Sequence, residues 1–134
     1  MTILVTDTGF STPAPVSAVP LAEITAHQGV LDLAHTDDPT LAEPHLAGLH
    51  LIRISFPAFS DGRAFTIARR LRMAGYKGEL RAMGPVIADQ YAMARRVGFD
   101  SVEIPDDLAA RQPQEQWIFR ADWQAHDYQS RLRA

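Results

Sequence analysis

The chain has 134 residues, of which 46% are apolar and 22% are charged, with no cysteine and a formal net charge of −3. This length predicts one domain with a single core, and the lack of cysteine excludes disulfides, thiolate catalysis, iron–sulfur ligation and cysteine-type zinc sites. No basic leader with a long apolar segment opens the chain, and Arg53, His50 or proline interrupts the longest apolar stretches. We therefore expect a soluble, cytoplasmic protein with no membrane partner.

Positive charge is concentrated in the middle of the chain. Residues 61–103 hold eight Lys or Arg against five Asp or Glu, whereas the remainder holds five Arg against eleven acids. This asymmetry favours an anionic ligand or an acidic partner surface for the middle segment. The alternative is that its helical arginines form solvated helix faces: Arg69, Arg70, Arg72, Arg95 and Arg96. A sequence pI of about 5.9 and the lack of a known nucleic-acid-binding motif argue against nucleic acid as a partner.

Residues 1–28 are expected to form an irregular N-terminal arm that follows an opening strand at Thr2–Val5. Pro13, Pro15 and Pro20 are spaced too closely for a helix. This part of the chain therefore gives little regular structure to the expected fold.

A core of repeated βα units is expected over residues 29–105. It begins with a strand at Val30–Leu33, after which Asp37-Asp38-Pro39 is typical of a helix start and residues 41–46 of a short helix. Leu49–Phe56 predicts the next strand, because β-branched and aromatic residues alternate there with polar ones.

The remaining elements alternate as a helix capped by Ser60 or Asp61 and ended by Gly75, a strand at Lys77–Met83, a helix from Pro85 to Gly98 and a strand at Ser101–Ile104. This order predicts an α/β fold with a small parallel sheet, half-barrel-like or Rossmann-like, and right-handed crossovers. Residues 106–134 form a C-terminal helical and aromatic segment, and all three parts make one domain. The apolar side chains of that segment are expected to pack on the domain rather than on a partner: Leu108, Trp117, Ile118, Phe119, Trp123 and Tyr128.

The expected strands alternate between an apolar and a polar face. The apolar face carries Leu31, Leu33, Ile52, Ile54, Leu80, Ala82, Val102 and Ile104. The polar face carries Asp32, Arg53, Ser55, Glu79, Arg81 and Glu103. Since buried charges require partners, we expect Arg53 and Arg81 to pair with Glu79, Glu103 or Asp32. This face is either solvated, the inside of a half-barrel, or closed by the C-terminal segment or a second copy in a homodimer.

Several motifs resemble one bacterial family: Phe56-Pro-Ala-Phe-Ser-Asp-Gly-Arg63, Ala68-Arg-Arg-Leu-Arg72, Gly75-Tyr-Lys-Gly-Glu-Leu-Arg-Ala82, Asp89-Gln90 and Gly98-Phe-Asp100. The chain is similar to the domain of unknown function 934 (DUF934) family, over roughly residues 29–104. The resemblance implies a place in assimilatory sulfate and sulfite reduction beside siroheme sulfite reductase, and a description as an oxidoreductase, without an established reaction or cofactor. The sequence departs from the family pattern at Phe65, where Tyr is common, and at Met83, where Val is expected.

The carboxyl ends of parallel strands are where ligands bind, so the two strand-to-helix turns are the candidate site. Asp61, Gly62 and Arg63 form the first turn, and Arg81 with Gly84 belongs to the second. If the turns meet, Arg63 and Arg81 bind a small oxyanion and Asp61 orients an arginine.

Asp89 and Gln90, early in the following helix, face the same rim on this interpretation, and Asp89 is the candidate catalytic acid or base. The structural alternatives are a helix cap for Asp61, turn glycines for Gly62 and Gly84, and a helix-side hydrogen bond for Asp89 or Gln90. Lys77, the sole lysine, is expected to belong to a helix-to-strand connection. No nucleotide-binding glycine motif is present. The histidines have no metal-binding spacing: His27, His35, His45, His50 and His126.

Two functional hypotheses remain. The first is a noncatalytic accessory protein that binds sulfite reductase through its basic α/β surface and aromatic segment. The second is a small anion-binding enzyme that uses Arg63 and Arg81. No motif fixes a reaction, a substrate or a cofactor.

Overall fold

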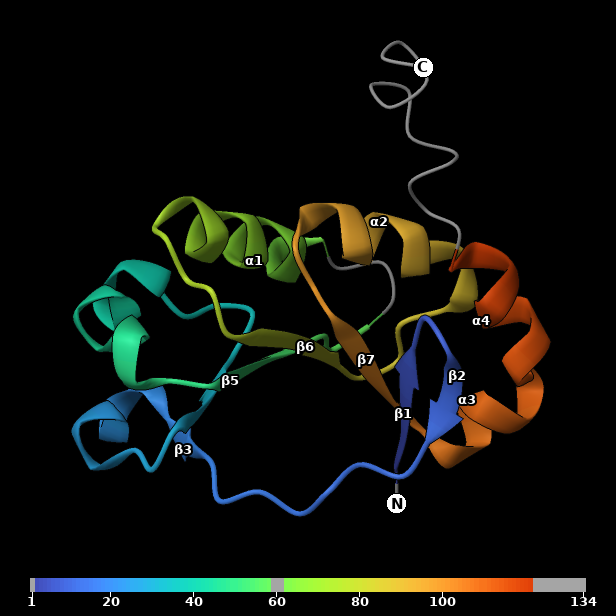
Figure 1. Cartoon of the computed structure of the whole chain (residues 1–134), viewed down its shortest axis with the longest axis horizontal. Helices are drawn as coiled ribbons and strands as arrows, with labels where there is room; N and C mark the ends of the chain where they lie inside the picture. Colours follow the sequence, from blue (N-terminus) through green and yellow to red (C-terminus); the bar gives the residue numbers. More distant parts are fainter. Residues whose placement is uncertain (1, 59–61, 122–134) are drawn as a thin grey trace, which may run out of the picture.

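The structure, a computed structural model, describes residues 2–58 and 62–121. It is an α/β fold around one seven-stranded sheet in the order β2-β1-β7-β6-β5-β4-β3 (Figure 1). The strands are β1 (Thr2–Thr6), β2 (Gly9–Ser11), β3 (Val19–Pro20), β4 (Val30–Leu33), β5 (Leu51–Ser55), β6 (Glu79–Met83) and β7 (Ser101–Pro105). β3 to β7 are parallel, and β1 runs antiparallel to both of its neighbours, β2 and β7.

From β4 to β7, each parallel strand lies beside the strand that precedes it in the sequence. Their order never reverses, whereas a Rossmann-like sheet reverses at its midpoint. The α/β prediction is therefore confirmed, and the strand order corresponds to the half-barrel-like form of it.

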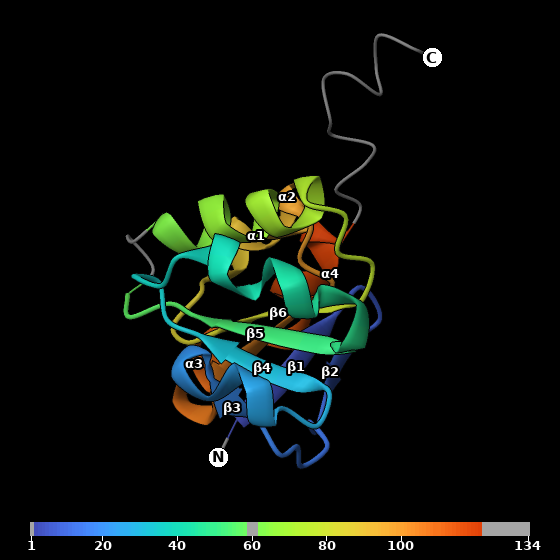
Figure 2. The ribbon, with the colours of Figure 1, turned by 90° about the vertical axis from the view of Figure 1, so that its left-hand side faces the viewer.

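Helical segments connect these strands and follow the last one. They are the 3₁₀ segments η1 (Leu21–Ala26), η2 (Pro39–Gly48) and η3 (Ala88–Gln90) and the helices α1 (Arg63–Met73), α2 (Tyr91–Val97), α3 (Asp106–Arg111) and α4 (Gln114–Arg120). α1 and α2 lie side by side on one face of the sheet (Figure 1), and η2 lies against α1 on that same face (Figure 2). No helix within the described ranges has the length and apolar character needed to cross a membrane.

Residues 1–28 are more regular than the expected arm. β1 continues into a hairpin with β2, where Gly9 adopts a φ of +118°, and Val19 and Pro20 add an edge strand to β4. Proline is tolerated on an edge strand because its missing N–H removes no ladder hydrogen bond there. Residues 12–18 are the longest stretch without a helix or strand in the described part of this segment.

The helices begin and end close to the expected residues, with one shift. Asp38 caps η2 by accepting a hydrogen bond from the Thr40 amide, and Gly98 ends α2 in the left-handed conformation. Residues 85–87 are not helical, Ile87 is extended, and the helical segment begins at Ala88, later than expected. Ser60 and Asp61, the expected caps of α1, lie outside the described residues, and Gly62 holds the cap position.

The two faces of the sheet differ as the alternation predicts. Every residue of the expected apolar face is at most 1% exposed, beneath α1 and α2. Phe56 follows β5 directly and lies on the same face of the sheet as Ile52 and Ile54. Its ring packs edge-on against that of Phe65 of α1, with 5.0 Å between the ring centroids. The core therefore lies between this face and the helices.

The polar face carries the expected ion pairs. Arg53 donates from Nε and Nη2 to the two carboxylate oxygens of Asp32, at 2.6 and 2.7 Å. Arg81 donates to Glu103 at 3.2 Å and to Glu79 at 3.3 Å. Arg81 is 6% exposed and Glu103 9%, so this part of the face is buried rather than solvated.

The C-terminal segment packs on the domain where the structure describes it. Trp117 is 1% exposed and meets Tyr91 edge-on, and Leu108 is 6% exposed. Ile118 and Phe119 remain exposed on α4. Trp123 and Tyr128 lie outside the described residues. The expected packing of Leu108 and Trp117 is confirmed.

Candidate functional site at the carboxyl edge of the sheet

A hollow of about 380 Å³ opens where β4 and β5 end, between η2 and α1. It is lined by His35, Asp37, Asp38, Pro39, Arg63, Thr66, Ile67 and Arg70. The first three residues belong to the connection from β4 to η2, Pro39 is the first residue of η2, and the last four belong to α1. This is the edge at which parallel sheets place ligands.

The α1 side of the hollow is one stripe of the helix. Arg63, Thr66, Ile67 and Arg70 are spaced by three, four and seven residues, which places them on one face of an α-helix. Ile67 is buried, whereas Arg63, Thr66 and Arg70 are exposed. The stripe therefore presents two guanidinium groups and a hydroxyl above an apolar floor.

The acidic side chains of the hollow serve the local backbone. Asp37 Oδ2 accepts a hydrogen bond from the Ala34 amide at 2.8 Å. Asp38 Oδ1 accepts from the hydroxyl and the amide of Thr40, at 2.7 and 3.0 Å. These Thr40 hydrogen bonds, with a smaller contribution from the charge of Arg70, lower the pKa of Asp38 below its usual value. Asp38 thus keeps its charge, and one oxygen of each of the two carboxylates orders the loop.

Among the candidates from the first turn, Arg63 lies in this hollow as the first residue of α1, next to Gly62. Asp61 lies outside the described residues. Gly62 has a φ of −89°, and no heavy atom approaches the position of an added Cβ within 4 Å. A residue other than glycine is therefore compatible with this position.

Arg81 does not lie beside Arg63 in the structure. Its guanidinium lies among Ser101, Glu103 and Glu79 on the polar face, opposite the face that carries α1. The two arginines that the sequence analysis placed on one anion are therefore separated by the sheet.

At Gly84 the backbone passes close to the backbone of Phe56. Its φ is +130°, its amide donates to the Glu103 carbonyl at 3.0 Å, and an added Cβ would lie 2.2 Å from the Phe56 carbonyl oxygen. This geometry supports the turn-glycine alternative, because only glycine fits so close an approach at a positive φ.

Asp89 and Gln90 form part of η3, next to α4. Asp89 pairs with Arg120 at 2.5 Å, and Gln90 Oε1 accepts from the Ile87 amide at 3.2 Å. Neither residue lines the hollow that contains Arg63. Both contacts match the helix-side hydrogen bonding that was the structural alternative for these residues.

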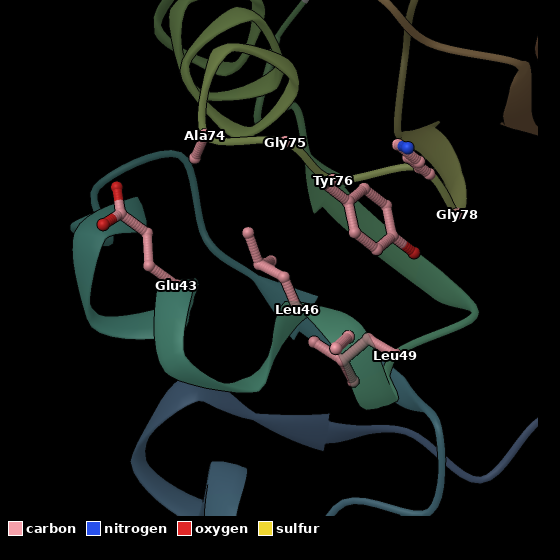
Figure 3. A pocket seen from close by; sticks show the side chains of 9 residues that line it. Glu43, Leu46, Leu49, Ala74, Gly75, Tyr76 and Gly78 are labelled. Atoms are coloured by element: carbon pink, nitrogen blue, oxygen red, sulfur yellow. The ribbon is translucent and has the colours of Figure 1, made fainter.

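A second hollow, of about 490 Å³, lies at the opposite, amino edge of the sheet, between η2 and the turn from α1 into β6 (Figure 3). Leu46, Leu49 and Tyr76 form its apolar wall, and Lys77 lines it as well. The Tyr76 hydroxyl donates to the Glu79 carbonyl at 3.1 Å, and burial raises the pKa of this phenol. An added Cβ on Gly78 would lie 2.3 Å from that hydroxyl, so the turn is closely packed.

The sequence analysis missed most residues of the carboxyl-edge hollow. It placed Asp37 and Asp38 at a helix start, gave His35 no metal-binding role and considered a solvated helix face for Arg70. The helical spacing of Arg70 from Arg63 was the available signal. Among residues 2–58 and 62–121, no three His, Asp or Glu side chains are placed to hold a metal ion.

Comparison with known proteins gives one match. A family model described as "Bacterial protein of unknown function (DUF934)" matches residues 30–134, which confirms the resemblance carried by the motifs. No curated protein and no solved structure matches the chain. The matched range holds both hollows, and β1, β2 and β3 precede it.

Proposed function

The chain belongs to the DUF934 family of bacterial proteins of unknown function, and from this premise we propose that it is a noncatalytic, cytoplasmic accessory protein of assimilatory sulfite reduction. In this role it binds siroheme sulfite reductase through the exposed side of α1 and α2. The link to sulfite reduction comes from the family resemblance. The surface comes from the charges of the two helices.

The observation that carries the proposal is that α1 and α2 contain no acidic residue. Four arginines lie in α1 and two in α2. The two helices pack side by side, so their charges add on one side of the molecule (Figure 1). Positive charge concentrated in this way favours an acidic partner surface and accelerates its association.

Two of these arginines hold the fold together. Arg72 donates to the Gly98 carbonyl and to Asp100, both at 2.8 Å through Nη2. Arg95 pairs with Asp7 at 3.1 Å. Their charges already have close acidic partners, so they contribute less to a partner surface.

Arg69 and Arg96 are exposed, and exposed methionines accompany them. Met73 of α1 is 78% exposed and Met93 of α2 is 52% exposed. Arginine and methionine are both enriched in protein interfaces relative to other surfaces. We define the docking surface as these four residues: Arg69, Met73, Met93 and Arg96.

The alternative function, an enzyme that binds one anion between Arg63 and Arg81, has less support. Arg81 is 6% exposed and already donates to two carboxylates. An anion at Arg81 would have to displace these internal partners, which leaves the buried carboxylate of Glu103 uncompensated.

Direct binding of purified siroheme sulfite reductase tests the proposal. Calorimetric titration at low salt is expected to show saturable binding that weakens as salt screens the charges. The absence of binding at low salt would contradict the docking role.

A growth experiment tests the pathway separately. A strain that lacks the gene is expected to grow with cysteine and to grow poorly with sulfate as the sulfur source. Equal growth on both sources would separate the protein from sulfite reduction, whatever it binds.

A further inference from the structure

We propose that the hollow between η2 and α1 binds a small polar molecule that carries a phosphate or sulfate group. This site goes beyond the docking role, because it uses Arg63 and Arg70 rather than the residues of the docking surface. It lies at the carboxyl edge of β4 and β5, and its volume of about 380 Å³ falls in the usual range of small-molecule sites.

The positive groups of the hollow suit an oxyanion. Arg63 and Arg70 both line it, with Thr66 between them on the same stripe of α1. A guanidinium presents a planar fork of N–H donors that matches two oxygens of a phosphate or sulfate, and the threonine hydroxyl adds a further donor. The three side chains thus offer donors along one wall of the hollow.

The acidic groups of the hollow indicate that the ligand carries hydroxyl groups in addition to its anionic group. Asp37 and Asp38 each use one carboxylate oxygen on the backbone, at Ala34 and Thr40, and the other oxygen of each has no such backbone bond among the described contacts. A carboxylate oxygen accepts hydrogen bonds but repels an anion. The matching ligand therefore places its charged group toward α1 and hydroxyl groups toward the β4–η2 loop.

The separation of the two arginines also favours an organic ligand. Seven residues span about 10 Å along a helix at a rise of about 1.5 Å per residue. A ligand with a body attached to its anionic group fills this length of the hollow, whereas a bare inorganic anion occupies one end of it. We therefore expect a sugar phosphate to bind more tightly than inorganic phosphate.

Calorimetric titration with inorganic phosphate, sulfate and ribose 5-phosphate tests the site. The wild type is expected to bind ribose 5-phosphate saturably, with one molecule per chain, and the inorganic anions more weakly. Replacing one arginine of an oxyanion site removes charge-assisted hydrogen bonds, so R70A and R63A are each expected to weaken binding by at least about tenfold.

Arg69 provides the matched control, because it is the neighbour of Arg70 on α1 and is exposed, but does not line the hollow. R69A is expected to bind ribose 5-phosphate like the wild type. T66E places a carboxylate inside the hollow on an exposed helix position and is expected to abolish binding while the thermal midpoint stays near that of the wild type.

Three outcomes overturn the proposal. These are no binding of any of the three probes by the folded wild type at millimolar concentration, an equal loss of affinity in R69A and R70A, and undiminished binding by folded T66E. None of them decides the docking role, because that role is measured with sulfite reductase and not with these three probes.

Discussion

Asp32 and Arg53 lie opposite each other on β4 and β5, and both carboxylate oxygens of Asp32 accept hydrogen bonds from Arg53, at 2.6 and 2.7 Å. The hydrogen bond to Asp32 raises the pKa of Arg53 above its usual value, which is already far above neutral. The guanidinium of Arg53 therefore stays charged at neutral pH. Among the described residues, the Asp32–Arg53 pair is one of two ion pairs that tie neighbouring strands together on the polar face.

The second pair, Arg81 with Glu103, gives the first prediction. E103A is expected to lower the free energy of unfolding by about 3 kcal/mol, because it leaves a buried guanidinium with Glu79 alone. Urea denaturation at neutral pH measures this. D107A breaks an exposed pair with Arg111 and is expected to change stability by less than about 0.5 kcal/mol. Equal effects of the two substitutions would show that burial of the Arg81 pair has no energetic role.

The crossing of Gly84 over Phe56 gives the second prediction. G84A places a Cβ 2.2 Å from the Phe56 carbonyl oxygen at a φ of +130°, so it is expected to destabilise the protein by more than about 3 kcal/mol. G62A adds a Cβ in open space and is expected to stay within about 0.5 kcal/mol of the wild type. Thermal unfolding compares the two, and a mild effect of G84A would contradict the close approach.

The third prediction concerns Tyr91, which is fully buried and donates its hydroxyl hydrogen to Asp7. Burial, followed by the hydrogen bond and charge of Asp7, raises the pKa of Tyr91 above its usual value. The native state therefore keeps the phenol protonated while the unfolded state loses the proton above about pH 10. Stability from this group is complete below that pH and falls as pH rises toward the native pKa.

Y91F tests this interpretation by removing the hydroxyl alone. At neutral pH it is expected to cost about 1.5–3 kcal/mol, the usual range for a hydrogen bond to a charged group. Above pH 10 the gap between Y91F and the wild type is expected to narrow, by up to about 1.4 kcal/mol per pH unit. Urea titrations at several pH values measure both effects, and a gap that stays constant up to pH 11 would contradict the raised pKa.

The strands and their two faces could be predicted because alternation is a local property. Leu31, Ile52, Leu80 and Val102 share a face once their strands are parallel neighbours, and the ion pairs of the opposite face follow from the same parity. The hairpin of β1 and β2 was missed because the short Thr6–Gly9 turn was not distinguished from the proline-rich arm after it.

The candidate site was only partly predictable. A position at the end of a strand does not fix the face from which a side chain leaves the sheet. Arg81 has the parity of Glu79, which directs it to the polar face, whereas α1 carries Arg63 on the apolar face. His35 and Arg70 come together because η2 packs against α1, and no local pattern encodes that contact.

The central claim, docking through the acid-free side of α1 and α2, is tested most directly by the affinity of purified sulfite reductase for two charge-reversed forms. The double variant R69E/R96E changes the docking surface, and R111E changes an exposed arginine on α3 that already pairs with Asp107. The account predicts that the double variant binds at least about tenfold more weakly than the wild type while R111E retains wild-type affinity. Wild-type affinity of the folded double variant, or a loss of the same size in R111E, would contradict it.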